Sequence, residues 1–402
     1  MEIEIDYTVK IQLDSPKLSS ILAKIPDVLT SMINQIIRAV LLSFSERELA
    51  HRKSSFTCEK CGSTDRWHWK TRNAKHTSLL TEFGKLEFPD LQIQCGCCGK
   101  RKVIAREMLG VEKRARIPLQ TVRKLGLLGA LATFRVSAKI ASLFGIKLNK
   151  MTIWRAVQKV GKEIGFSLDP DEPGIGEADG TGISINGILK RGKEIKVFLQ
   201  MKAAGGCRLA GVTIDKYNAG WNKLFKPLRH QFKAFEKFLL ITDGDDSILK
   251  GIGKNVKVIF QRCLWHIPHQ FKWYRWKDGI KLKDPIWITA MVNLIDICDV
   301  SRLRLDDESC LAEMLKQKRA RLEMLIDDCR TRGWNTSAKY LENAKADLFR
   351  SVENRLTGKT QSHAERVMRT TKMRTGVGKW NVSSALNCIK IRLAYYYNEW
   401  DA

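Results

Sequence analysis

The sequence predicts a multidomain protein of mixed α+β and α/β class, and three observations support this prediction. The 402 residues exceed what one small hydrophobic core usually holds, so two to four domains are expected. Two C-x-x-C-G motifs flank a stretch of alternating polarity in a basic segment. After residue 175, strand-like runs come first in succession and then alternate with helical patterns.

The composition restricts the class of function. The chain has 70 Lys and Arg against 43 acidic residues, a formal charge of +27, which favours nucleic acid over a small acidic substrate as the partner. A hydrophobic fraction of 44% excludes a disordered chain. We find no secretory signal and no apolar run near the roughly 18–20 residues of a membrane span, so no membrane partner is expected.

The cysteines indicate the compartment. There are eleven, an odd number, and five of them lie between Cys58 and Cys98. Such clustering favours metal ligation in a reducing environment over a disulfide framework. We therefore expect a cytoplasmic protein.

Residues 1–50 are predicted to form an N-terminal helical segment after a short strand-like start. Apolar residues recur there at helical spacing, at Leu18, Leu22, Ile25, Val28 and Leu29. The pattern suits a dimerisation element and a plain core helix equally.

Residues 51–118 are predicted to form a zinc ribbon that binds DNA. The runs 79–83 and 85–94 alternate apolar and polar residues as hairpin strands do, with Gly84 at the turn. The motifs supply four thiolates for a closed, structural Zn²⁺ site: Cys58, Cys61, Cys95 and Cys98. Cys97 is a spare thiol that could compete as a ligand.

Residues 119–168 are predicted to form a helix-turn-helix-like helical domain. The segment 137–145 fits the first helix and turn, and 152–160 fits the recognition helix. The second segment directs three side chains outward, which we predict to contact DNA: Arg155, Gln158 and Lys159. A three-helix bundle without DNA contact is the alternative.

A ribonuclease H-like catalytic core is predicted in two parts, residues 175–264 and 351–402, separated by an all-α insertion at 265–350. Strands are expected at 182–188, 195–203, 208–214, 238–242 and 256–261, with a helix at 221–235. In this order the first and fourth strands are neighbours, which would bring Asp179 beside Asp243. The insertion interleaves aromatic and basic residues that suit either base stacking or core packing: Trp265, Lys272, Trp273, Tyr274, Arg275, Trp276 and Lys277.

Three carboxylates are predicted to be catalytic and to bind two Mg²⁺ or Mn²⁺ ions: Asp179, Asp243 and Glu365. Oxygen ligands of this kind hold the metal pairs that support in-line displacement at phosphorus. Asp245 and Asp246 compete with Asp243 for this role, and Glu353 competes with Glu365. Alternatively, Glu365 pairs with Arg369 one helical turn away.

Basic residues surround Glu365 on a predicted helix. Four of them are expected to bind DNA phosphates: Arg366, Arg369, Lys372 and Arg374. Cys263 and His266 could form half a zinc site, but no matching pair stands nearby, and we expect them beside the active site.

Four motifs together resemble the DDE transposases of the Mutator superfamily (MULE-type), in their prokaryotic insertion-sequence branch. They are Asp179-Gly180, Asp243-Gly244, Cys263-Leu264-Trp265-His266 and Thr360-x-Ser362-x-x-Glu365-Arg366, and the resemblance covers roughly residues 55–400. The extra acids Asp245 and Asp246 depart from the family pattern.

The resemblance implies a nucleoid-associated transposase that cleaves transposon ends and joins the freed 3′-hydroxyl to target DNA. Its partners would be double-stranded DNA, both terminal inverted repeats and target, and further copies of itself in a homo-oligomer on DNA. Two other functions remain open: a transposase-derived DNA-binding regulator without cleavage, and a ribonuclease H-like nuclease or resolvase.

Overall fold

The computed structural model describes residues 11–12, 17–55, 57–64, 66–71, 76–187, 192–217, 219–300, 303, 308–356 and 362–401. Chain contacts divide the protein into two compact units, Met1–Val160 and Gly161–Asp401. The mixed α/β composition predicted from the sequence is confirmed. The expected strand-like start, Ile188 at the end of the first predicted core strand, and Thr360 of the last motif lie outside the described residues.

The first unit begins with a long helix that packs on a small sheet. Leu41 and Leu49 on one face of this helix share a buried cluster with Trp67 and Ile93 of the sheet. The elements are α1 (Leu18–Ser55), the antiparallel sheet β1-β4-β5 (Trp67–Thr71, Gln92–Cys95, Arg101–Val103), the hairpin β2-β3 (His76–Thr81, Gly84–Pro89) and α2 (Ala105–Met108).

Part of α1, Lys24–His51, is long and apolar enough to cross a membrane by length and composition. This differs from the sequence-based expectation that no segment comes near that length. The same helix also makes polar contacts with the hairpin, since Asn34 Oδ1 accepts the Glu87 N–H at 2.6 Å and Thr30 Oγ1 donates to the Phe83 carbonyl at 2.6 Å. These contacts, with the buried face of α1, make it a packing helix of the first unit.

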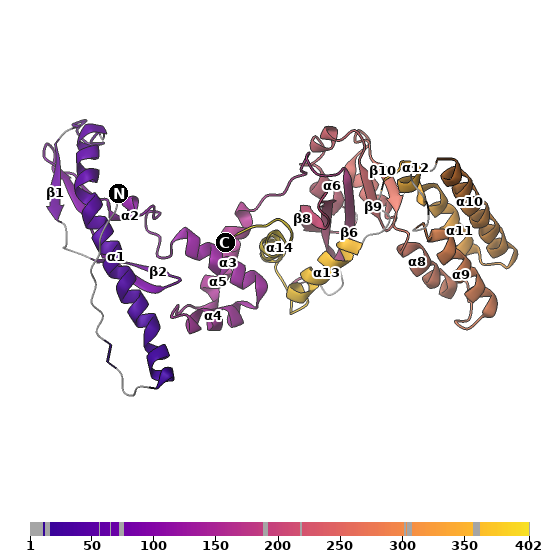
Figure 1. Ribbon diagram of the computed structural model, residues 1–402, viewed down its shortest axis with the longest axis horizontal. Helices are drawn as coiled ribbons and strands as arrows, with labels where there is room; N and C mark the ends of the chain where they lie inside the picture. Colours follow the sequence, from indigo (N-terminus) through magenta and orange to yellow (C-terminus); the bar gives the residue numbers. More distant parts are fainter. Residues whose placement is uncertain are drawn as a thin grey trace. The chain divides into compact units, whose positions relative to one another are not determined.

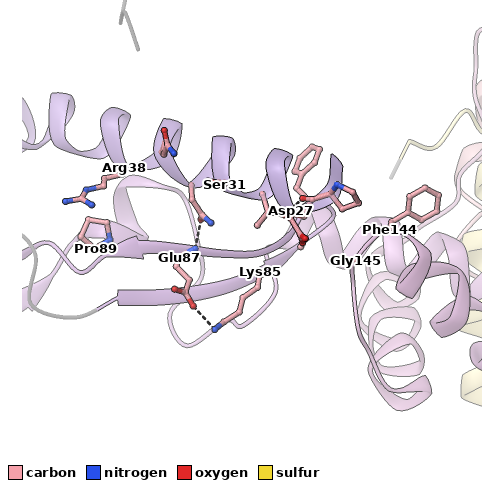
Figure 2. A pocket seen from close by; sticks show the side chains of 14 residues that line it. Asp27, Ser31, Arg38, Lys85, Glu87, Pro89, Phe144 and Gly145 are labelled. Atoms are coloured by element: carbon pink, nitrogen blue, oxygen red, sulfur yellow. Dashed lines mark hydrogen bonds and ion pairs between the residues drawn. The ribbon is translucent and has the colours of Figure 1, made fainter. Parts of the chain in front are cut away.

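The hairpin is shorter than predicted. The expected strand 85–94 is divided into β3 and β4, which belong to different sheets, because Pro89 lacks the N–H that a continuing ladder requires. Gly84 follows the turn with a φ of +98°, and a Cβ there would lie 3.0 Å from Thr30 Oγ1 of α1. A cavity of about 540 Å³ lies between α1 and the hairpin, and Phe144 and Gly145 also line it. Figure 2 shows its lining side chains, among them the ion pair of Lys85 and Glu87.

Three helices complete the first unit: α3 (Leu119–Leu131), α4 (Phe134–Leu143) and α5 (Lys150–Glu163). Ala141 of α4 is buried against Ile153 and Ala156 of α5, so the small side chain lies where these helices meet. Gly145 follows α4 with a φ of +78°, a conformation that glycine adopts without strain. The helices fall where the sequence predicts them, within a few residues at each end.

The second unit contains a five-stranded sheet of order β10-β9-β6-β7-β8. β6 pairs antiparallel with β7 and β7 with β8, whereas β9 is parallel to β6 and to β10. The predicted neighbourhood of the first and fourth strands is thus confirmed. The strands are β6 (Ile175–Ile183), β7 (Lys193–Met201), β8 (Cys207–Asp215), β9 (Leu239–Thr242) and β10 (Ile259–Arg262).

Two of the predicted bounds were wrong. β6 begins at Ile175, seven residues before the predicted start at 182, so Asp179 lies in the middle of the strand and not near its end. The predicted helix 221–235 is limited to α6 (Gly220–Phe225), followed by a 3₁₀ turn, η1 (Gln231–Ala234), because Pro227 has no N–H to continue the helix.

Helices cover both faces of this sheet (Figure 1). On one face, Trp221 and Phe225 of α6 pack on Ala178 and Phe198, together with α7 (Asp246–Ile252). On the other face lie α13 (Ser362–Thr375), which contacts β6 and β7, and α14 (Val382–Tyr397), which contacts β8. Successive residues of β6 therefore face different helices.

Between β10 and α13 the described residues form helices and no strand. Their common core includes Phe271, Leu294, Leu322 and Leu341. In Figure 1 they gather beside β10: α8 (His266–Lys277), α9 (Pro285–Cys298), α10 (Glu308–Thr331), α11 (Asn335–Ala344), η2 (Lys345–Asp347) and α12 (Arg350–Glu353).

Candidate active site

The first two predicted carboxylates come from adjacent parallel strands. Glu177 of β6 pairs in register with Ile241 of β9. Extending that register by two residues places Asp179 level with Asp243, the first residue after β9. Strand pairing alone therefore brings these two side chains to the same part of the sheet.

A buried glutamate, Glu177, attaches the helix of the third carboxylate to the same strand. Its side chain is 1% exposed, and Oε2 accepts the N–H of Ala364 at 2.7 Å. The nearby N–H of His363 also favours the ionised form of this carboxyl group. Because Ala364 belongs to the first turn of α13, Glu177 satisfies a donor that the helix itself cannot. The start of α13, and with it Glu365, is thereby fixed against β6.

The pKa values show that the carboxylates interact. Burial, opposed by the Gly180 N–H and assisted by the charges of Asp243, Glu365 and Glu194, raises the pKa of Asp179 to about 7. Burial likewise raises the pKa of Asp243. Groups that repel one another in a desolvated place are held there at a cost unless a cation compensates them.

The neighbouring acids of the β9 loop have other partners. Asp245 caps α7, where its carboxylate accepts the Ser247 N–H at 2.8 Å and the Ser247 hydroxyl at 2.7 Å. Asp246 is exposed. Asp243 is thus the acid of this loop whose charge acts on Asp179 most directly.

The glycine after Asp243 makes room for an arginine. Gly244 has a φ of +96°, and a Cβ there would collide with Nη1 of Arg262. The space beside Gly244 is filled by the Arg262 guanidinium, whose charge opposes the rise in the pKa of Asp243 that burial causes.

Glu365 lies beside His266 at the start of α8. Its Oε1 is 3.5 Å from the histidine Nε2. Burial lowers the pKa of His266, which favours the neutral ring at pH 7. No ion pair joins Glu365 to Arg369 within the part of the chain that the structure describes, and the competing acid Glu353 pairs with Arg319 and Arg350.

Cys263 is next to this group through its backbone. Its N–H donates to the carbonyl of Thr242, which precedes Asp243, at 2.7 Å, and its side chain is buried in a small apolar cluster with Ile175, Leu239 and Ile241. Across the described residues, the one set of three or more His, Cys, Asp or Glu ligand atoms that all lie within 4.8 Å of one another is a group of four cysteines in the first unit. The carboxylate oxygens of Asp179, Asp243 and Glu365 therefore do not all lie within 4.8 Å of one another.

These four cysteines are the predicted ligand set of Cys58, Cys61, Cys95 and Cys98. The Sγ atoms of Cys58 and Cys98 are 3.6 Å apart, and those of Cys61 and Cys95 are 3.7 Å apart. A tetrahedral ion with Zn–S bonds of about 2.3 Å requires sulfur separations of about 3.8 Å, so the four thiols fit structural zinc. The spare thiol, Cys97, is exposed and outside the group.

The two cysteine motifs fold alike. The Gly62 N–H donates to the Cys58 carbonyl and the Gly99 N–H to the Cys95 carbonyl, with φ values of +71° and +70° at the two glycines. The nearby N–H groups of Lys60 and Cys61 and the thiols of Cys98 and Cys61, opposed by burial, lower the pKa of the Cys58 thiol to about 6. Glycine after the second cysteine therefore allows the chain to turn back and aim amides at sulfur.

Of the four predicted phosphate-binding residues on α13, Arg366, Arg369 and Lys372 are exposed. Arg374 is 5% exposed, and its guanidinium lies 4.6 Å from the centre of the Trp380 ring. Arg374 is therefore less available to DNA than the other three residues, because its guanidinium packs on Trp380.

The predicted recognition helix, α5, exposes Arg155 and Lys159 and half-buries Gln158. The Lys159 Nζ lies 3.0 Å from Glu112, an exposed pair that contributes little to stability. Arg155 is the most available of the three for a phosphate or base.

Sequence reasoning missed two features near the carboxylates. One is the role of Glu177, which the alternation Glu177-x-Asp179 on a strand could have indicated. The other is Lys196 on β7, which is fully buried, donates to Glu194 at 2.7 Å and lies 4.9 Å from the centre of the Trp221 ring. A single lysine in an apolar run of the sequence does not indicate that it will be buried and paired with Glu194.

No protein-family model and no curated protein matches the chain.

Proposed function

We propose that the chain is a DNA transposase of the DDE type, with Asp179, Asp243 and Glu365 as its catalytic carboxylates. The observation that supports this most is the electrostatic coupling of the three acids, which gather where β9 ends beside the middle of β6. They come from β6, from the loop after β9 and from α13, which are far apart in the sequence. The strand order β10-β9-β6-β7-β8 is that of a ribonuclease H-like core, and we propose this fold assignment with the function.

The donor set suits two Mg²⁺ or Mn²⁺ ions, because hard divalent cations prefer carboxylate oxygens. Bound there, the ions would supply charge stabilisation for displacement at phosphorus. The His266 ring lies beside Glu365, with its Nε2 3.5 Å from Oε1 of the carboxylate. The buried environment that raises the pKa of Asp179 favours a cation as the partner of this carboxyl group.

DNA binding would use positive surface on both units. Arg366, Arg369 and Lys372 extend from the helix that carries Glu365, so a phosphate held by them would lie near the carboxylates. The zinc ribbon and Arg155 of α5 would bind the terminal repeats. Such a protein would act in the cytoplasm, on the nucleoid, as a homo-oligomer.

The test is incubation of the purified protein with Mg²⁺ and linear DNA containing the two ends of the element that flanks its gene. Nicks at the ends and joined products would support a transposase. Shifted DNA that is never nicked would indicate a DNA-binding regulator, and cuts without joined products a nuclease or resolvase.

The matched variant is Asp179→Asn. It should abolish cleavage and leave DNA binding nearly unchanged, because it removes a metal ligand and no positive surface. Full cleavage by this variant would refute the assignment of Asp179.

A further inference from the structure

A cavity of about 790 Å³ lies between the loop after β9 and the helices α8 and α11 of the insertion. Pockets of roughly 300–1,000 Å³ are the usual size for small ligands. Asp243 forms part of its wall, so any occupant would lie directly beside the proposed catalytic site.

Two polar groups at this cavity lack partners. Tyr340 is 6% exposed and its hydroxyl, in the part of the chain that the structure describes, makes no hydrogen bond. The same holds for Nε of the buried Arg262. Both residues line the cavity. Both atoms are shielded from solvent at the cavity wall. Buried polar atoms are nearly always bonded, and a water, an ion or a ligand group at the site is one explanation for those that are not.

The lining also has flat and bifunctional groups. The rings of Tyr274 and Tyr340 stack with centres 4.6 Å apart and planes at 23°. Gln270 and Asn343 offer amides that both donate and accept. A nucleobase presents a flat π face and an edge of alternating donors and acceptors, which such a lining complements.

The charges limit the occupant further. Lys277 and Lys339 could each neutralise a phosphate. Four aspartates also line the cavity and would repel a triphosphate: Asp243, Asp245, Asp246 and Asp347. One nucleotide of a DNA strand, with a single phosphate on each side, fits this balance better than a free nucleoside triphosphate.

We propose that this cavity binds one unpaired nucleotide of the DNA strand that the carboxylates act on. A base can enter such a pocket only after it leaves the duplex, so the protein would prefer DNA with an unpaired base. The inference rests on the proposed function for the identity of the strand, but the binding it predicts requires neither Mg²⁺ nor cleavage.

The test uses the full chain in magnesium-free buffer and two fluorescein-labelled duplexes. One is fully paired, and the other is identical except for one unpaired nucleotide. Fluorescence anisotropy should give about tenfold tighter binding to the second, since stacking of one base contributes enough for that preference.

Two variants locate the preference. Tyr340→Phe should lower it about fivefold, because the hydroxyl loses one hydrogen bond while the ring remains. Tyr274→Leu should lower it about tenfold by removing the aromatic face. Tyr395→Phe, an exposed tyrosine away from the cavity, is the matched control and should keep the full preference.

Equal affinity of the unmodified protein for the two duplexes would overturn the proposal. So would a preference that both Tyr340→Phe and Tyr274→Leu retain. A preference that disappears in these variants, in a protein that never cuts DNA with Mg²⁺, would support the cavity and refute the transposase assignment, so the two failures are distinguishable.

Discussion

Replacing Glu177 by Ala should loosen α13 without unfolding the rest of its unit. The substitution leaves the N–H of Ala364 without its buried acceptor and removes the carboxylate beside the N–H of His363. An unsatisfied buried donor costs about 1–3 kcal/mol and a lost cap about 0.5–2 kcal/mol, so we expect a loss of about 2–3 kcal/mol.

Hydrogen exchange detected by mass spectrometry measures this locally. Peptides from Ser362–Thr375 should exchange about 30–150 times faster in the Ala variant, the factor that 2–3 kcal/mol of easier opening implies. Peptides from α14 and from the first unit serve as internal references. Unchanged exchange in α13 would show that Glu177 does not hold this helix.

The Gln variant tests the protonation state of the same group. Burial, opposed by the N–H groups of Ala364 and His363, raises the pKa of Glu177 from 4.5 to about 8. An acid whose pKa is higher in the folded state binds its proton more tightly there. Its contribution to stability is full below pH 4.5 and is lost as the pH rises to about 8.

Between these limits Glu177 alone should lower the free energy of unfolding by about 1.4 kcal/mol per pH unit. Glu177→Gln resembles the protonated acid and keeps an acceptor for the amides. We therefore expect α13 to exchange at wild-type rates at pH 5 and more slowly than wild type at pH 8. A wild-type pH dependence that persists in the Gln variant would contradict the argument.

Three further predictions concern the zinc group and the basic helix. Zinc chelation, or Cys58→Ser, should abolish the thermal transition of the first unit, whereas Cys97→Ser should leave it intact, because Cys97 is outside the ligand group; a transition insensitive to both would exclude structural zinc. Arg366→Ala with Arg369→Ala should reduce the slope of log K against log salt by about 2, since each phosphate contact contributes about 0.9, and an unreduced slope would remove both residues from the interface. Arg374→Ala should leave that slope unchanged but destabilise the second unit by about 2 kcal/mol through the lost contact with Trp380, which calorimetry would detect; a weaker salt dependence with normal stability would reverse this assignment.

The sequence allowed prediction of the features that depend on local spacing. The ligand group of Cys58, Cys61, Cys95 and Cys98 followed from the repeated C-x-x-C-G motif, because each turn is closed by its own glycine. The pairing of the strands that carry Asp179 and Asp243 followed from the order of strands and helices, which leaves few topologies.

Features that depend on packing could not be predicted in this way. The burial of Arg374 and the amide contacts of Glu177 are set by which face of α13 meets the sheet, and a helix with charges on several sides does not reveal this. The bounds of β6 were misplaced because Gly176, Gly180 and Gly182 weaken the strand signal, whereas pairing with β7 and β9 compensates for them in the folded sheet.

Glu177 and the Ala364 N–H that donates to it are 187 residues apart in the sequence, and this separation has a consequence during synthesis. A ribosome adding about 5–20 residues per second needs about 10–40 s to travel from one partner to the other. For that time the nascent chain already holds its first unit and two of the three acids, but not Glu365. Under the proposed function, a polypeptide released early would retain the zinc ribbon and α5 of the first unit, and it would occupy transposon ends without cutting them. Premature termination would then produce an inhibitor of the full-length protein from the same gene.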